Sequence, residues 1–453
     1  MRIIKTGHTW PILVALVPAV TSCAHYRPQP LDSNLSSVAV PSSTVLSLNS
    51  QAITRPFLKP ATIDLAQPLD LNAVATLAVL LNPDLTAQRL RAGVADAQSF
   101  AAGLLPDPTF SFGADKVLSG PDTLLGLTSS LGFNLAALRT RNLTRARARA
   151  EARRIRLDLA WAEWQTSGQA RIQAVRIGAL EKSVELSRAS RDANQALLDR
   201  MLRAAGRGDI LPDQVQGARV AAFDAAERLR TSEKELGAAR FELVRLIGLP
   251  PEYPLKLAPV PLPTAPPEAS MLYDIALRER TDLQALRSGY AAQEAAVHKA
   301  VLDQFPTLDI TLNGARDTAG NLTIGPAVAL TLPVWNRNRG GIAIEAATRA
   351  ALKAEYEARL FQTRAEIAGA VSGLRVVRDQ RAAILRNLPA LQRFAAANRR
   401  AADRGDLAQN TALTAEQALR DQQILLSQAD RDIAEQTIAL ELLTGVPQEA
   451  WSR

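Results

Sequence analysis

Residues 204–214 read AAGRGDILPDQ, and residues 401–411 read AADRGDLAQNT. Both stretches contain an Arg-Gly-Asp turn followed by an aliphatic residue, and the two glycines, Gly208 and Gly405, are 405 − 208 = 197 positions apart. The same offset relates LIGLP at 246–250 to LTGVP at 443–447. A register shared over about 45 residues indicates an internal duplication, whose unit is far longer than the roughly 20–50 residues of a solenoid repeat.

The segments before both turns predict very long helices. Residues 139–204 contain no proline, and residues 341–403 contain only Pro389. Helices of roughly 60 residues would be about 90–100 Å long at 1.5 Å per residue. Such rods need partners along their length, and apolar residues spaced by seven on the returning segments predict coiled-coil packing. These residues are Leu229, Leu236 and Leu243 in one half and Leu426, Ile433 and Leu440 in the other.

The turns themselves have residues suited to ending and starting helices. Gly208 and Gly405 are expected to end the long helices, because glycine readily adopts the left-handed conformation found there. Asp209 and Asp406 are expected to cap the helices that follow. Each half therefore reads helix, hairpin, very long helix, sharp turn and returning helix.

Each long helix is preceded by two short segments of strand character. In residues 308–313, apolar side chains alternate with Asp309, Thr311 and Asn313. Alternation over about 9–11 residues matches a tilted transmembrane strand. A small soluble β-domain packed on helices would show the same alternation, so that alternative stays open.

The N-terminus predicts export. Residues 1–22 combine a basic start with a short apolar stretch, as in a secretory signal peptide. The stretch ends in VTSC, which resembles a bacterial lipobox, and Cys23 is the only cysteine. Cys23 would then be acylated, for example with palmitate, and Ala24 at the next position implies sorting to the outer membrane. The alternative is an ordinary signal peptide with an incidental cysteine.

The composition favours long helices over a compact mixed core, because aromatic residues are only 4% of the chain. The formal charge of +8 is mildly basic and decides nothing about partners. After the signal peptide no stretch reaches about 18 apolar residues. A chain of this kind would have to cross a membrane with strands.

These patterns divide the chain into segments. We expect a signal peptide (1–22), a lipidated extended tail (23–69), repeat one (70–255), a Pro-rich linker (256–267) and repeat two (268–453). The hairpins are expected at about 106–135 and 306–334, and the tips at about 204–211 and 402–409.

Over about residues 70–450 the chain resembles the TolC-type outer-membrane efflux family, lipoprotein type. The resemblance rests on the duplicated plan, the two hairpins, PVWNRNRGGIA at 333–343 and the Leu-x-Gly-x-Pro end of each half. Details of the second half are similar to the outer-membrane component of cobalt–zinc–cadmium resistance pumps. The resemblance implies a mainly α-helical homotrimer, in which four strands per chain form a twelve-stranded β-barrel above an α-helical barrel.

The resemblance also implies a function. The protein would be a passive conduit that spans the outer membrane and the periplasm of a Gram-negative bacterium, exporting drugs, metals or other small molecules. Its partners would be a periplasmic adaptor protein and an inner-membrane transporter of the resistance–nodulation–division type.

Two sets of candidate functional residues follow. The resemblance implies that the tips contact the adaptor or lie at the gate, where rings of carboxylates favour cations; helix capping on a solvated tip is the alternative. The tip residues are Arg207, Gly208, Asp209, Asp213, Asp403, Arg404, Gly405 and Asp406. Basic and aromatic residues that follow the hairpins are expected to contact lipid head groups. These are Arg139, Arg141, Trp335, Arg337 and Arg339.

The sequence also allows three other functions to be considered: nucleic-acid binding, catalysis and a role as a periplasmic spacer. The eight arginines of residues 139–156 could neutralise nucleic-acid phosphates, but the export signal and the lack of interleaved aromatic residues oppose nucleic-acid binding. No His or Cys cluster has metal-ligand spacing, so we expect neither catalysis, nor a metal, nor a cofactor other than the lipid on Cys23. A periplasmic coiled-coil lipoprotein, acting as a spacer or adaptor without a channel, stays open as the alternative.

Overall fold

The computed structural model describes residues 26–31, 40–53, 55–122 and 124–452. The chain divides into two units, residues 1–40 and 41–453. Of the first unit, residues 26–31 and 40 are described, and they are exposed and lack regular secondary structure. The expected signal peptide (1–22) and Cys23 lie outside the described residues.

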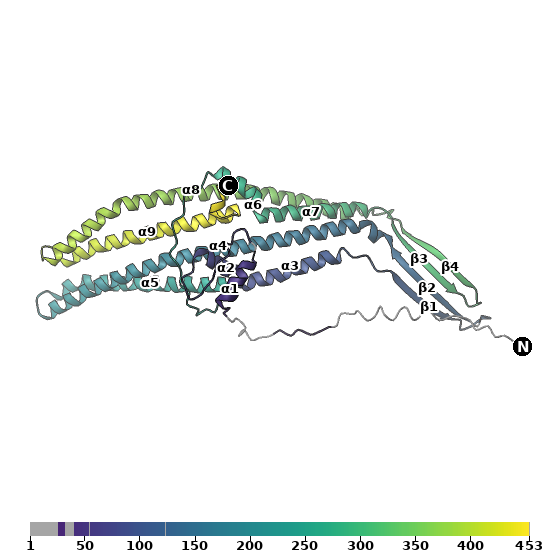
Figure 1. The fold of residues 1–453 in the computed structure, drawn as a ribbon, viewed down its shortest axis with the longest axis horizontal. Coiled ribbons are helices and arrows are strands. Elements are labelled where there is room, and N and C mark those ends of the chain that lie inside the picture. Colours follow the sequence, from purple (N-terminus) through teal and green to yellow (C-terminus); the bar gives the residue numbers. More distant parts are fainter. Residues whose placement is uncertain (1–25, 32–39, 54, 123, 453) are drawn as a thin grey trace. The chain divides into compact units, whose positions relative to one another are not determined.

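This unit is mainly helical and contains the same succession of elements twice (Figure 1). Repeat one has α2 (Leu71–Leu81), α3 (Pro83–Ala101), β1 (Thr109–Lys116), β2 (Leu125–Asn134), α4 (Leu135–Gly206), the 3-10 helix η4 (Pro212–Val215) and α5 (Gln216–Ile247). Repeat two has α6 (Ala269–Glu279), α7 (Thr281–Leu302), β3 (Thr307–Arg316), β4 (Leu322–Thr331), α8 (Arg339–Asp403), α9 (Gln409–Thr444) and the 3-10 helix η5 (Gln448–Ala450). The expected fold class, long helical hairpins with a pair of β-hairpins, is confirmed.

The helices and strands share one lateral order. Helix α4 contacts α3 and α5 on one side and α7 and α9 on the other, and α8 contacts α7 and α9. The antiparallel sheet has the order β1-β2-β3-β4. Figure 1 shows the sheet at one end of the helices and the two tips at the opposite end. The unit therefore has two long edges: β1 with α3 and α5, and β4 with α8.

The long helices pack through the predicted seam. Helix α4 has 72 residues and α8 has 65, or roughly 108 and 98 Å at 1.5 Å per residue. Of the six predicted seam residues, Leu229, Leu236, Leu243, Ile433 and Leu440 are buried, whereas Leu426 is half-buried. Burial of residues spaced by seven is what coiled-coil packing requires.

The expected extended tail (23–69) is wrong for residues 43–53 and 55–69. Ser43–Ala52 form helix α1, whose Leu46 is fully buried with Ile63 in the core of repeat one. The Arg55 Nε atom lies 2.5 Å from Oε2 of Glu163 on α4, and Glu163 is only 1% exposed. The Ser- and Pro-rich composition of this segment suggested an extended chain, but a few of its apolar residues pack into the core of repeat one.

The single helix expected before the first hairpin is two helices, α2 and α3. It breaks at Asn82 because Pro83 occupies the first position of α3, where its missing N–H costs nothing. The Asn82 side chain caps α3 by accepting from the Leu85 amide at 3.0 Å. Repeat two has the equivalent break, at Arg280 between α6 and α7.

Among the residues that the structure describes, no helix is at once long enough and apolar enough to cross a bilayer.

Candidate functional site

The four-stranded sheet has one apolar and one polar face. Antiparallel pairing places directly opposed residues on the same face, and successive residues alternate between faces. The apolar face has Phe110, Phe112, Leu125, Leu127, Leu131, Phe133, Leu308, Ile310, Leu312, Leu322, Ile324, Val328 and Leu330. The polar face has Thr109, Ser111, Asp115, Thr128, Ser130, Asn134, Thr307, Asp309, Thr311, Asn313, Thr323 and Thr331.

The residues that the structure describes cover neither face of the sheet. Within the four strands only Gly126 and Gly132 are buried. On the apolar face, Phe112 is 64% exposed and Ile324 is 81% exposed. A soluble domain rarely leaves such a contiguous apolar surface open, so this face requires a partner or an apolar solvent. A small β-domain packed on helices, the alternative left open by the sequence, does not match this arrangement.

The expected membrane-interface arginines are bound to backbone carbonyls. Arg139 donates to the carbonyls of Leu302 and Pro306 at 3.1 and 3.0 Å. Arg141 donates to the carbonyls of Gly103 and Leu104. These contacts tie the start of α4 to the ends of α7 and α3, so the two side chains position the hairpins on the helices.

The second hairpin enters its long helix through a different turn. Arg337 and Asn338 adopt positive φ angles of 47° and 49°, which is uncommon for residues other than glycine. The Asn338 side chain donates to the Ala300 carbonyl at 2.8 Å and so ties this turn to α7. Trp335 is 87% exposed beside it, and Arg339 donates to the Trp335 carbonyl. The Asn338 contact thus gives one residue of the PVWNRNRGGIA stretch (333–343) a structural role at this turn.

Both tips have the same backbone geometry. Gly208 and Gly405 have φ angles of 81° and 82°. The amide after each glycine donates to a carbonyl five residues earlier, Asp209 to Ala204 and Asp406 to Ala401, both at 2.9 Å. These bonds form a Schellman motif. The prediction that the two glycines end the long helices is confirmed.

The prediction that Asp209 and Asp406 cap the following helices is wrong. Their carboxylates instead accept from Arg207 and Arg404, each at 2.8 Å. The next helix begins too far along the chain for capping, since α9 starts at Gln409 and α5 is preceded by η4. Arginine two residues earlier offers a closer, charged donor, so the aspartates pair within the turn.

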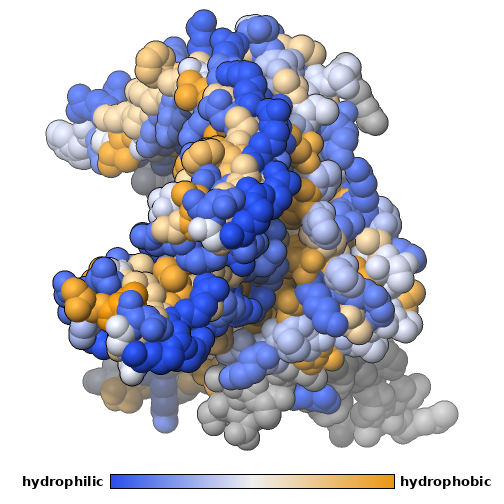
Figure 2. Space-filling view, turned by 90° about the vertical axis from the view of Figure 1, so that its left-hand side faces the viewer, coloured by the Kyte–Doolittle hydropathy of each residue, from blue (hydrophilic) through white to orange (hydrophobic). Residues whose placement is uncertain are grey.

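The remaining tip aspartates, Asp213 and Asp403, do not join the two turns. Asp213 accepts from the backbone amide of Gln214, and Asp403 pairs with Arg399 at 3.3 Å. Figure 2 looks onto the end of the unit that has the tips and shows a largely hydrophilic surface. The tips thus offer two separate Arg-Gly-Asp turns to a partner.

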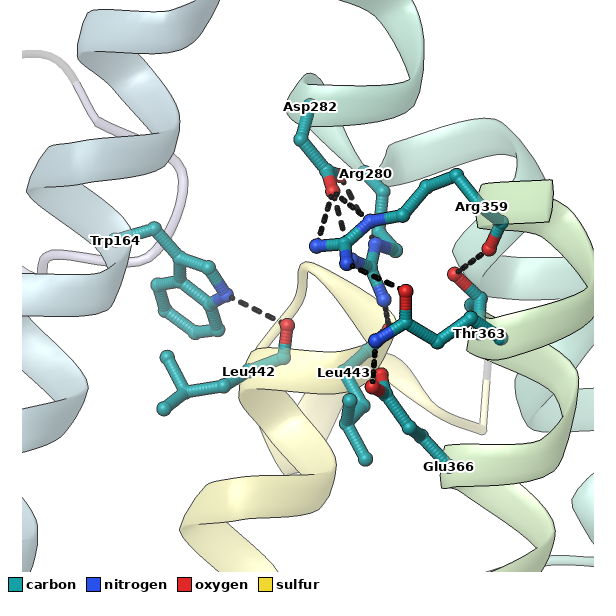
Figure 3. Close-up of polar contacts among 9 residues, drawn as sticks. Trp164, Arg280, Asp282, Arg359, Thr363, Glu366, Leu442 and Leu443 are labelled. Carbon is teal, nitrogen blue, oxygen red and sulfur yellow. Dashed lines mark hydrogen bonds and ion pairs between the residues drawn. The ribbon is translucent and has the colours of Figure 1, made fainter. Parts of the chain in front are cut away.

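A buried ionic cluster at the α6–α7 joint was missed by sequence reasoning. Arg280, only 1% exposed, donates to both carboxylate oxygens of Asp282 at 2.9 and 2.7 Å, and Arg359 of α8 donates to the same carboxylate at 3.1 Å (Figure 3). The Arg280 guanidinium also stacks over Trp161 at 4.8 Å. The helix boundaries align Asn82-Pro83-Asp84 with Arg280-Thr281-Asp282. This offset is 282 − 84 = 198, one more than the 197 that relates the tips, so the duplication in the sequence did not by itself pair these residues.

Opposing effects act on the pKa of Asp282. Burial would raise this pKa, but hydrogen bonds and charge from Arg280, then from Arg359, outweigh burial and hold it below the usual range. Asp282 is therefore ionised at neutral pH and neutralises the buried Arg280. Among the described residues, no group of three or more His, Cys, Asp or Glu side chains is placed to hold a metal ion.

Comparisons with known proteins agree with this geometry. Residues 272–446 match the family model for outer membrane efflux proteins. No curated protein matches the chain.

Solved channels share the fold. A structure of CusC superposes with a TM-score of 0.67 over 87% of this chain and 97% of that chain, at 17% identity. CmeC of Campylobacter jejuni gives 0.71 over 83% and 85%, at 14% identity. VceC of Vibrio cholerae gives 0.69 over 83% and 96%, at 17% identity.

Proposed function

We propose, from the premise that residues 272–446 match the family model for outer membrane efflux proteins, that the protein is the outer-membrane channel of a tripartite efflux pump. It would be a passive conduit through which drugs, metals or other small molecules leave the cell. The observation that carries the proposal is the sheet, which has an uncovered apolar face and an uncovered polar face. An apolar outer face and a polar inner face are the pattern of a strand that separates lipid from a water-filled channel.

The free edges of the unit support assembly from copies of this chain. Strands β1 and β4 each pair on one side only, and exposed strand edges promote pairing with further strands. The helical edges also expose aromatic side chains, with Phe361 on α8 and Phe241 on α5 exposed by 77% and 60%. Three copies joined edge to edge would close the sheets into a twelve-stranded barrel, a head-to-tail contact that ends in a ring.

The tips are the proposed contact with the pump. Helices of roughly 100 Å would carry the Arg-Gly-Asp turns away from the membrane into the periplasm. There the turns would meet a periplasmic adaptor, and through it an inner-membrane transporter of the resistance–nodulation–division type. The two ion pairs, Arg207–Asp209 and Arg404–Asp406, hold equivalent shapes and charges for that contact.

Acylation of Cys23 would anchor the N-terminus in the same membrane. Several acyl chains would give firm attachment, at about 0.8 kcal/mol per buried methylene. We expect Cys23→Ala to abolish incorporation of labelled fatty acid while trimers still form, because the sheets insert on their own. Label that persists in the variant would overturn the lipid assignment.

The channel proposal is tested with two lysine substitutions in the middle of β4. Val328 lies on the apolar face and Ala327, its exposed neighbour, on the polar face. A lysine facing the lipid midplane costs about 2–4 kcal/mol, whereas one facing a channel costs little. Val328→Lys should sharply reduce heat-resistant trimers in the outer-membrane fraction, while Ala327→Lys should leave them abundant.

Two outcomes contradict the proposal. Equal trimer yields for the two variants would show that β4 does not separate lipid from water. A soluble monomer after removal of residues 1–23 would favour the periplasmic spacer instead.

A further inference from the structure

The charged residues of the sheet are sorted by face. The four strands contain four charged side chains, Asp115, Lys116, Asp309 and Arg316. The register opposes Lys116 to Leu125 and Arg316 to Leu127, on the apolar face. Both aspartates lie on the polar face, which therefore has negative charge and no positive charge from the strands.

The neighbours of the two aspartates leave their charge uncompensated. Asp115 is opposed to Gly126, and Asp309 to Ala329 on one side and Asn134 on the other. Within the described part of the chain, neither carboxylate has a salt bridge or a side-chain hydrogen bond. Gly126 and Ala329 are too small to shield a carboxylate. The negative charges of Asp115 and Asp309 can therefore attract cations in the solvent that contacts the polar face.

The two carboxylates lie at opposite ends of the sheet. Asp309 is level with Asn134, next to the helices, and Asp115 is level with Gly126, next to the hairpin turns. From Gly126 to Asn134 is 134 − 126 = 8 steps along β2, or about 27 Å at about 3.4 Å per residue. Asp115 and Asp309 thus lie at the two ends of one polar surface.

We infer that Asp115 and Asp309 make the strand section of the channel selective for cations. The inference rests on the proposed function, since three copies would turn each aspartate into a ring of three carboxylates, one ring at each mouth of the strand section. Rings of carboxylates raise the local concentration of cations and repel anions. Positively charged small molecules would therefore pass this section more readily than anions.

The test is the reversal potential of purified trimers in planar lipid bilayers under a potassium chloride gradient. The wild-type protein should prefer potassium to chloride. Asp115→Asn combined with Asp309→Asn should lower the permeability ratio by about threefold or more, because the rings then lose their charge. Asp115→Asn alone and Asp309→Asn alone should each lower the permeability ratio by part of this amount. Asp309→Glu keeps the charge, so this variant should have the wild-type permeability ratio.

The matched controls are Lys116→Gln and Arg316→Gln. These residues lie in the same strands on the opposite face, so their loss should leave the permeability ratio unchanged. An unchanged ratio in the double aspartate variant, with normal conductance, would overturn the inference and leave the channel intact. If Lys116→Gln and Arg316→Gln change the permeability ratio as strongly as the aspartate variants do, then the assignment of the aspartates to the channel face and of the two basic residues to the opposite face is wrong. Wild-type trimers that insert but pass no current would instead overturn the proposed function.

Discussion

The joints between α2 and α3 and between α6 and α7 have the same backbone plan and different side-chain chemistry. In each joint, the side chain at the helix break donates to a carbonyl near the end of the returning helix: Asn82 to Leu246 at 2.8 Å, and Arg280 to Leu443 at 3.1 Å. In each, a glycine at positive φ then ends that helix, Gly248 at 88° and Gly445 at 80°. Both repeats therefore share the contact between the helix break and the end of the returning helix, and the glycine turn that ends this helix.

The difference lies in what each side chain needs around it. The Asn82 amide is neutral, so two hydrogen bonds, one donated and one accepted, satisfy it. Arg280 has a full charge at 1% exposure and depends on Asp282, which in turn binds Arg359. A buried charge is tolerated only with a well-placed counter-ion. Loss of one side chain should therefore lower the free energy of unfolding more at the α6–α7 joint than at the α2–α3 joint.

The largest expected effect is that of Asp282→Ala. This change leaves Arg280 buried without its closest counter-ion, and losing one partner of a buried pair costs about 3–5 kcal/mol. Asn82→Ala should cost about 1–3 kcal/mol, the cost of leaving a buried carbonyl without a donor. Denaturant unfolding of the detergent-solubilised protein, followed by circular dichroism, measures both.

The matched control for this comparison is Asp84→Ala. Asp84 is the exposed counterpart of Asp282 in repeat one, so its loss should have little effect on stability. Equal losses from Asp282→Ala and Asp84→Ala would mean that the ionic cluster does not support the second joint.

The next largest expected loss of stability is that of Gly248→Ala, which should exceed that of Gly405→Ala although both glycines have the same left-handed conformation. A Cβ on Gly248 would lie 2.6 Å from the Leu81 carbonyl oxygen, whereas a Cβ on Gly405 would have no neighbour within 4 Å. Gly405→Ala should therefore cost only the left-handed conformation, about 1–2 kcal/mol. Gly248→Ala should cost more, because the α2 backbone must also move. Melting temperatures that fall by the same amount would contradict the close approach.

Acid should loosen the second joint before the first. The pKa of Asp282 is lower in the folded protein than in the unfolded chain, so its contribution is complete above the unfolded-state pKa of about 3.9. That contribution is lost as pH falls through the folded-state pKa. The hydrogen-exchange protection of the amides around 280–284, corrected for the slower intrinsic exchange at low pH, should fall on acidification more than the protection around 82–86, where Asn82 does not titrate. An equal loss of protection at both joints would argue against this.

The smallest effect on stability is expected at the tips. The pairs Arg207–Asp209 and Arg404–Asp406 are exposed, and exposed pairs contribute about 0–1 kcal/mol. Arg404→Glu and Asp406→Lys should leave the amount of outer-membrane protein unchanged and weaken efflux, measured as drug or metal accumulation in cells. Normal efflux with both substitutions would remove the tips from the proposed function. The equivalent changes at Arg207 and Asp209 show whether the two tips are used alike.

Most of the helices, strands and turns could be predicted from the spacing of residues along the chain. The alternation in residues 308–313 predicted the strand, and the repeated Gly208 and Gly405 predicted the ends of the long helices. The tips were assigned the wrong internal contacts because Asp209 had two possible partners, a helix amide and the guanidinium of Arg207. Which partner is nearer depends on where the next helix begins, and boundaries are the least reliable part of a sequence-based prediction.

The sequence alone determined the duplication, the long helices, the hairpins and the two faces of each strand, because all of these depend on residue spacing along one chain. Only the tertiary structure decided that Arg280 needs Asp282 and Arg359, that Arg139 binds the carbonyl of Leu302, and that Leu46 and Ile63 of the expected tail join the core. These contacts bring together segments that are distant in the chain or have no period of their own. Their energies depend on burial and geometry, and neither quantity exists until the helices have packed.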